Sequence, residues 1–347
     1  MAYIYWLTIP MGCLSLLMIH HLTGGRWGLP IRRIMEASSR TLYVMAILFI
    51  PIALGISKLY PWYYWPSTPN SDPNLAFKRA YLTPGFFTVR AVIYFVILFG
   101  IVFILNKWSS EQDRTGDPRL QIKMASLSGI GCVIFAFTVT GMVVDWVMSL
   151  EPDWFSTIYG FIFIAIGFYT SMAFMVITLK KNYEQLKNSF RASDQNDLGS
   201  FLLTFTILWA YFSFSQFLII WAGNLKDEIP WFLTRAFGGW GAVGGFLLLF
   251  HFFVPFFLLL QKHIKRDIGK LSKVATWMMI VSLVDVYWIV MPAFDKAGPH
   301  LHLMDIVSVA LIGAIWFTTF KWQLGKMPLL PLHDTRFEGV LEHEHGD

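Results

Sequence analysis

Apolar runs of about 20 residues, the length that carries a helix across the hydrocarbon core of a bilayer, recur from one end of this chain to the other. Only 14% of the 347 residues are charged. Soluble domains carry about 25% charged residues, so this chain cannot cover a water-facing surface. The sequence therefore predicts an all-α polytopic membrane protein with about nine transmembrane helices. The expected spans lie near 3–22, 41–60, 85–106, 122–149, 154–179, 198–223, 233–261, 273–293 and 303–324.

Lysine and arginine concentrate in alternate connections between these spans. Nine spans place the connections 26–40, 107–123, 180–191 and 262–273 on one face, together with the residues that follow 324. The positive-inside rule assigns that face to the cytoplasm. We attribute the net charge of +5 to these connections and infer no nucleic-acid binding from it. Residues 1–326 are expected to form the membrane domain, and 327–347 a cytoplasmic C-terminal tail.

The cysteine content limits the redox chemistry that the chain can carry by itself. Its two cysteines, Cys13 and Cys132, both fall in apolar runs, and neither belongs to a C-x-x-C or C-x-x-C-H motif. Covalent c-type haem and a self-held iron–sulfur cluster are thereby excluded. We predict no cofactor held by ligands of this chain.

Ionisable residues inside the predicted spans are informative because charge there is costly and usually faces protein or water, and three of them are the main candidates. Asp145 lies about one turn inside the outer end of the fourth span. It is either an interfacial acid paired with an arginine or a protonatable group in a proton path or quinone pocket. Asp285 lies near the middle of the eighth span, too deep for its short side chain to reach water. We expect a functional or tightly paired role for Asp285.

His251 lies near the middle of the seventh span, and Pro255 follows four residues later. The proline ring removes the amide that would bond the carbonyl of residue 251. The pair therefore predicts a kink and a free carbonyl beside an ionisable side chain, where water can enter. A histidine satisfied within the core is the alternative interpretation.

Further polar residues fall at two depths. The outer group comprises Asp145, Gln216, Asn224, Arg235 and Asp305. The inner group comprises His20, His21, Glu36 and His251. We hypothesise two half-paths that meet near Asp285. Asp145, His251 and Asp285 carry protons in this hypothesis, while Gln216, Asn224 and Asp305 border a quinone or water pocket. His20, His21 and Glu36 form the cytoplasmic half-path, with interfacial histidines at the headgroups as the alternative.

Three strings carry a family resemblance: "DWVMSLEPDWFSTIYG", "WAYFSFSQFLIIWAGNLKDEIPWFLTR" and "HHLTGGRWG" followed by "RRIMEAS". They resemble the NrfD/PsrC-like family of quinone-interacting membrane proteins, in particular the ActF-type subunits of bacterial alternative complex III. The resemblance covers nearly the whole chain and implies two four-helix bundles plus peripheral helices, usually ten spans. The present chain has "EPDW" where a histidine is expected before the tryptophan, which leaves residue 153 without an assigned role.

The resemblance also implies a function. Alternative complex III oxidises menaquinol or ubiquinol and passes electrons through partner iron–sulfur and haem c subunits to a cytochrome c or a terminal oxidase. The chain is then expected to be a membrane subunit of this quinol oxidoreductase in the bacterial inner membrane. Expected partners are lipids, an ActC-like paralogue and the redox subunits. Proton translocation is the expected task of an ActF-type subunit, while a quinone pocket and an enzymatic activity of its own stay open.

Three other interpretations stay open. The chain could be the paralogous ActC-type, quinol-oxidising subunit, or a secondary transporter, whose spans are often broken near the midplane. A b-type cytochrome would need axial histidines at matching depth, and His20 or His21 matches His251 poorly. We therefore expect no haem in the isolated subunit.

Overall fold

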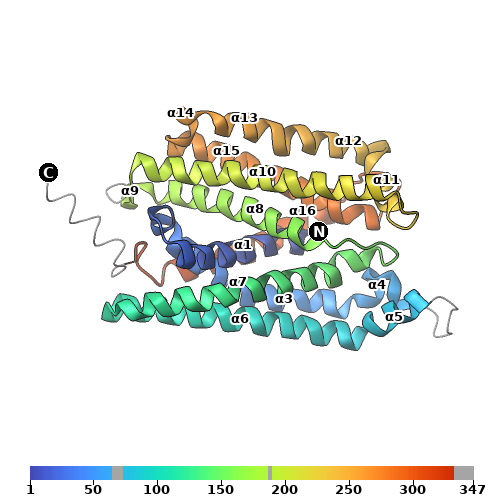
Figure 1. Cartoon of the computed structure of the whole chain (residues 1–347), viewed down its shortest axis with the longest axis horizontal. Coiled ribbons are helices and arrows are strands. Elements are labelled where there is room, and N and C mark those ends of the chain that lie inside the picture. Colours follow the sequence, from blue (N-terminus) through green and yellow to red (C-terminus); the bar gives the residue numbers. More distant parts are fainter. Residues whose placement is uncertain (65–72, 187–189, 332–347) are drawn as a thin grey trace.

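The structure of the protein is a computed structural model that describes residues 1–64, 73–186 and 190–331 (Figure 1). Within those ranges it is helical, and nine helical segments are long and apolar enough to cross a membrane. The predicted fold class and the number of spans are confirmed for the described residues. The greater part of the predicted tail, 332–347, lies outside them.

The first bundle is built from the N-terminal half of the chain. Its long helices are α1 (Ala2–Thr23), α2 (Arg32–Arg40) leading into α3 (Leu42–Leu54), α6 (Pro84–Thr115) and α7 (Pro118–Trp146). Short helical segments connect them: η1 (Arg26–Ile31), α4 (Ile56–Leu59), η2 (Pro61–Tyr64), α5 (Pro73–Tyr81) and η3 (Met148–Leu150).

The second bundle follows with the same number of spans. Its long helices are α8 (Tyr159–Lys181), α10 (Ala192–Gly223), α15 (Ile268–Val290), and α12 (Gly238–Leu247) joined through the π-helix η5 (Leu248–Phe253) to α13 (Val254–Leu260). Short segments are α9 (Tyr183–Leu186), α11 (Ile229–Ala236), α14 (Lys262–Lys265) and η6 (Met291–Ala293). The last span, α16 (Leu303–Leu324), is peripheral and packs on α1 and α2.

Helices α1 and α8 form the centre of the molecule, where the two bundles meet. Their apolar segments are 83% buried, against 17% for α16. A methyl group added at Gly12 would lie 2.1 Å from the carbonyl oxygen of Gly167. Small residues at a helix crossing let two backbones touch, and dispersion contacts then hold the helices together in lipid. The bundles are thus joined directly through the backbones of α1 and α8.

The segment 26–40 departs from the sequence prediction. It was expected to be a connecting loop, but it folds as η1 and α2, and its charged residues Arg32, Arg33 and Glu36 are fully buried. Arg32 Nε lies 3.0 Å from Glu36 Oε1, and Arg33 Nη1 lies 2.6 Å from Glu36 Oε2. Spacings of three and four residues bring these charges together on a helix. Because each charge has a partner, the helix can be buried. A hydropathy average does not take such pairing into account.

The basic connections all lie at one end of the helices. This end is the left side of Figure 1, with α9 and α14, while α4, α5 and α11 lie at the other end. We call the first end the basic face and the second the opposite face. The assignment of the basic face to the cytoplasm stays a prediction.

Candidate functional site

A break in the seventh span builds the site. Segment 248–253 is a π-turn in which the amide of Val254 bonds the carbonyl of Leu249, five residues back. Pro255 has no amide to donate. The carbonyl of Phe250 accepts instead from Trp277 Nε1 at 3.0 Å, and that of His251 from the Tyr169 hydroxyl at 3.2 Å. The free carbonyl predicted from Pro255 therefore exists, and a side chain of α8 satisfies it.

The imidazole of His251 is fully buried between two aromatic rings. The Tyr169 ring stacks on it with centroids 4.2 Å apart and an interplanar angle of 14°, and the Trp209 ring lies 4.1 Å away. Its Nε2 atom lies 4.0 Å from Oδ2 of Asp285. Within the described part of the chain, neither ring nitrogen has a hydrogen-bond partner. Buried polar atoms are nearly always bonded, so two unbonded nitrogens on one buried ring are an exception that needs an explanation.

Asp285 is buried on α15 and accepts a hydrogen bond from Trp209 Nε1 at 2.9 Å. Among the described residues no lysine or arginine lies within ion-pair distance of its carboxyl, and His251 is its nearest basic group. One turn closer to the basic face, the Ser282 and Thr170 hydroxyls are 2.7 Å apart. An ionisable group at this depth without a permanent counter-charge is typical of proton and ion paths.

Asp285 also lines a cavity of about 740 Å³ that extends from mid-membrane toward the opposite face. Its walls come from α8, α10, α11, α12 and α15 and are largely aromatic and aliphatic. Gly245 of α12 lines the cavity, and the missing side chain leaves open space there. A methyl group added at Gly245 would meet no atom within 4 Å. The lining residues Tyr211, Phe214 and Leu248 are also exposed on the outer surface. The cavity is therefore reachable sideways, between α10 and α12.

Arg235 and Gln216 border the same cavity nearer the opposite face. The buried Arg235 guanidinium donates to Glu151 Oε2 at 2.6 Å and to the Ile289 carbonyl at 2.8 Å. Gln216 accepts a hydrogen bond from the Ser156 hydroxyl. Two members of the predicted outer group thus share a cavity with Asp285, with the Arg235 guanidinium paired to Glu151 and the Gln216 amide oxygen bonded to Ser156.

Asp145 lies in the first bundle, apart from this cavity. Its two carboxylate oxygens accept from Arg90 Nε at 2.7 Å and Nη2 at 2.9 Å, and Tyr94 donates at 2.8 Å. The guanidinium carbon of Arg90 lies 3.7 Å from the centroid of the Tyr81 ring. A bidentate pair of this kind fixes both groups. Of the two sequence interpretations of Asp145, the geometry matches the acid paired with an arginine.

Two other residues of the outer group do not join the cavity. Asn224 is exposed and ends α10 in a left-handed conformation with φ 47°. Asp305 caps the start of α16 by accepting from the His302 amide at 3.0 Å. Both were expected to border a pocket, but both have local roles at helix ends. Their depth was estimated from the sequence, and depth does not give the side of the bundle that they face.

The inner group also divides. His20 and Glu36 are buried near the basic face, where His20 Nε2 lies 3.2 Å from the Gly25 carbonyl oxygen and Glu36 accepts from Ser109 at 2.6 Å. His21 is buried beside them. His251, which was grouped with them, lies instead with Asp285 in the second bundle.

Sequence analysis missed the aromatic partners Tyr169 and Trp209. Aromatic residues inside apolar spans usually pack in the core or face lipid, so the residue type alone did not indicate a contact with His251. The one available signal was the free carbonyl beside Pro255, which needs a donor from a neighbouring helix. Which helix supplies it depends on packing that the sequence does not display.

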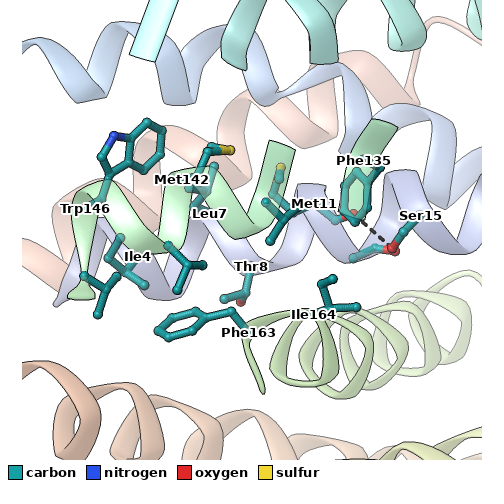
Figure 2. A pocket seen from close by; sticks show the side chains of 15 residues that line it. Ile4, Leu7, Thr8, Met11, Ser15, Phe135, Met142, Trp146, Phe163 and Ile164 are labelled. Atoms are coloured by element: carbon teal, nitrogen blue, oxygen red, sulfur yellow. Dashed lines mark hydrogen bonds between the residues drawn. The ribbon is translucent and has the colours of Figure 1, made fainter. Parts of the chain in front are cut away.

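A second cavity, of about 40 Å³, lies between α1, α7 and α8 (Figure 2). Figure 2 shows apolar side chains around it, with Thr8 and Ser15 as polar neighbours. Ser15 donates to the Met11 carbonyl at 3.2 Å, so its hydroxyl is already used. The space is too small for a ligand of ordinary size, and its walls offer few polar partners to a water. Among the described residues, no group of three or more histidine, cysteine or acidic side chains could hold a metal.

No model of a known protein family matches the chain, and no curated protein matches it either. Membership of the NrfD/PsrC-like family therefore stays a proposal based on the quoted strings.

Proposed function

We propose that the protein is a proton-translocating membrane subunit of a bacterial quinol oxidoreductase of the alternative complex III type. The observation that carries the proton role is the Asp285 carboxyl: it borders a cavity of about 740 Å³, it has no cationic partner among the described residues, and His251 lies 4.0 Å behind it. The proposal of this particular complex is based on the resemblance of the quoted strings to ActF-type subunits.

The proposed path runs from the opposite face through the cavity to Asp285. From there a proton passes to His251, and then toward the basic face beside the Ser282 and Thr170 hydroxyls. A separation of 4.0 Å exceeds a hydrogen bond, so the transfer requires a small rotation of either side chain. Beyond Thr170, the buried His20 near the basic face continues the proposed route, whereas Glu36 is held in ion pairs with Arg32 and Arg33.

The same cavity is the proposed site for a quinone ring. Its volume falls in the range of about 300–1,000 Å³ that is usual for small-molecule sites, and its apolar walls open sideways between α10 and α12. Menaquinone and ubiquinone both combine a polar ring with a long apolar tail. Such a molecule can enter from the membrane and bring its ring oxygens to Asp285.

Electron transfer is assigned in this proposal to partner subunits that hold iron–sulfur clusters and haem c. The other proposed partners are an ActC-like paralogue, lipids and a terminal oxidase. The proposed location is the bacterial inner membrane, with the basic face and the C-terminus on the cytoplasmic side.

The test uses the assembled complex in sealed proteoliposomes. Asp285→Asn keeps the shape of the side chain and its acceptor oxygen for Trp209, but it removes the exchangeable proton. We expect quinol oxidation to continue while proton translocation is lost. Asp305→Asn, at a half-exposed helix cap, is the matched control and should translocate normally. Full proton translocation in Asp285→Asn would reject the proposed path.

A secondary transporter is the second candidate, because a span broken at mid-depth beside a cavity is also common in transporters. Purification under mild conditions separates the two classes. A subunit of a redox complex brings haem c and iron–sulfur partners with it, whereas a transporter purifies alone or with copies of itself. An ActC-type subunit would be distinguished from an ActF-type subunit by a quinol-binding site next to the iron–sulfur partner.

A further inference from the structure

We propose that a cavity at the basic face binds the phosphate headgroup of an anionic phospholipid. The cavity has a volume of about 420 Å³ and lies between α2, α3, α6 and α16 in and beside the first bundle. Its polar floor includes Arg40, Lys107, Asn106 and Ser110, and its apolar wall includes Tyr43 and Phe103. It is separate from the Asp285 cavity and does not depend on the proposed function.

Among the described residues, neither cation at this cavity forms an ion pair. The half-buried Arg40 donates from Nε to Asn106 Oδ1 at 2.7 Å and from Nη2 to the Met327 sulfur at 3.1 Å, and both acceptors are neutral. Over the described ranges, no carboxylate lies within 4.0 Å of Arg40 or of the exposed Lys107. A planar guanidinium held in place by neutral groups is well suited to bind phosphate oxygens.

The buried arginines differ from Arg40 in that each of them has an acidic partner. Arg32 and Arg33 pair with Glu36, Arg90 pairs with Asp145, and Arg235 pairs with Glu151. The chain thus supplies a carboxylate to each of these four arginines. Arg40 shares the basic face with Arg32 and Arg33, but the acids there, Glu36 and Asp113, are already bonded to those two. An anion from outside the chain would complete the site.

The apolar wall identifies the anion as part of a lipid. Phe103 is 68% exposed on the outer surface of α6, and exposed Ile47 and Ile50 continue the apolar surface along α3 toward mid-membrane. Acyl chains can lie along this surface while the phosphate reaches Arg40 and Lys107. Basic pockets between transmembrane helices at a membrane surface bind anionic headgroups in this way. A free phosphate would gain nothing from the apolar wall.

The test measures lipid retention by the purified full-length chain, using native mass spectrometry with added phosphatidylglycerol, phosphatidylcholine or inorganic phosphate. We expect phosphatidylglycerol to be retained and the other two to be lost. The double variant Arg40→Gln/Lys107→Gln should lose about thirtyfold in retention, since each of the two cations near the surface contributes about 1 kcal/mol and about 1.4 kcal/mol corresponds to a factor of ten. Lys262→Gln/Lys273→Gln removes the same charge from exposed lysines of the second bundle and should retain the lipid normally.

Three outcomes would overturn the proposal. These are unchanged phosphatidylglycerol retention in the double variant, equal retention of phosphatidylcholine, and binding of inorganic phosphate with similar affinity. Circular dichroism and the thermal midpoint show whether the double variant is folded. If it is not, the single change Lys107→Gln at an exposed position replaces it, and a loss of a few-fold is then expected while unchanged retention rejects the site.

Discussion

His251 Nε2 and Asp285 Oδ2 lie 4.0 Å apart inside the second bundle, on two different spans. Both side chains are buried, and Trp209 contacts both, by a hydrogen bond to Asp285 and by ring contact with His251. At this distance the charge of the acid and the charge of the imidazole interact, so a change in the protonation of one side chain changes the electrostatic energy of the other.

Replacement of His251 by phenylalanine separates its packing role from its chemical role. Phenylalanine fills nearly the same space between Tyr169 and Trp209, so the fold should be kept, with a thermal midpoint within a few degrees of the unchanged protein. Proton translocation by the assembled complex should fall at least tenfold because the ring nitrogens are gone. His251→Ala is the packing control and should destabilise the protein by about 2–4 kcal/mol. Normal translocation in His251→Phe would leave this histidine with a packing role only.

Filling the cavity tests whether the space itself is needed. A side chain at Gly245 points into open space, so Gly245→Leu should fold and even strengthen the helix, since glycine disfavours helix by about 1 kcal/mol. We expect this variant to lose quinone binding or proton entry, measured as activity of the reconstituted complex. Gly100→Leu, where an added Cβ likewise meets nothing on the outer surface of α6, should be fully active. Equal activity of both variants would show that the cavity is not used.

Breaking the ion pair of the first bundle should affect stability. Arg90→Gln leaves Asp145 buried without its cation, which costs about 3–5 kcal/mol for a pair of this kind. The double variant Arg90→Gln/Asp145→Asn removes both charges and should recover a large part of that loss. Thermal unfolding in detergent measures each step of the cycle. If Arg90→Gln is as stable as the unchanged protein, the pair has no structural role and the proton-carrying interpretation of Asp145 regains support.

Asp267 at the basic face gives a pH-dependent prediction. Its carboxylate caps α15 by accepting from the Lys270 and Gly269 amides, and these bonds lower the pKa of Asp267 below its usual value. A lowered pKa in the folded protein means that the stabilisation is fully present above the ordinary carboxyl pKa and is lost as the pH falls through the lowered one. Asp267→Ala should cost about 0.5–1 kcal/mol at pH 7, at the low end for a cap because the side chain is half exposed.

The measurement for Asp267 is the difference in thermal midpoint between the variant and the unchanged protein at two pH values. The difference should shrink as the pH is lowered into the range where the capping carboxylate becomes protonated. Asp267→Asn keeps a neutral acceptor, so its difference at pH 7 should be smaller, and it should also shrink in acid because the unchanged protein loses the charged cap there. A difference for Asp267→Ala that grows in acid would contradict the capping role.

The spans were predictable because each depends on a local property, the length of an apolar run. All nine expected spans overlap helices of the structure, and the carbonyl freed by Pro255 followed from the missing amide alone. Segment 26–40 was wrongly expected to be a loop because its charges neutralise one another through contacts with Glu36. Hydropathy averages residue types and is blind to such pairing.

The candidate site was predictable only in part, since sequence position gives depth along a span but not the direction in which a side chain points. Depth drew attention to Asp285 and His251, yet it assigned His251 to the inner group and left Asp285 between the two groups. It also grouped Asp145 with Gln216, although the structure puts them in different bundles. Direction is set by how the helices pack, and that emerges only when the chain is folded.

The π-turn at 248–253 holds one residue more than a regular helical turn would. Each residue of an α-helix advances by about 100°, so the two segments on either side are set out of phase. Before the turn, α12 directs its glycines at the hollow beside Asp285, and after it, α13 buries Leu259 and packs on α10. Deletion of one residue from the π-turn would restore a regular helix. It would also rotate α12 relative to α13, so that one of these two surfaces would face lipid instead of protein.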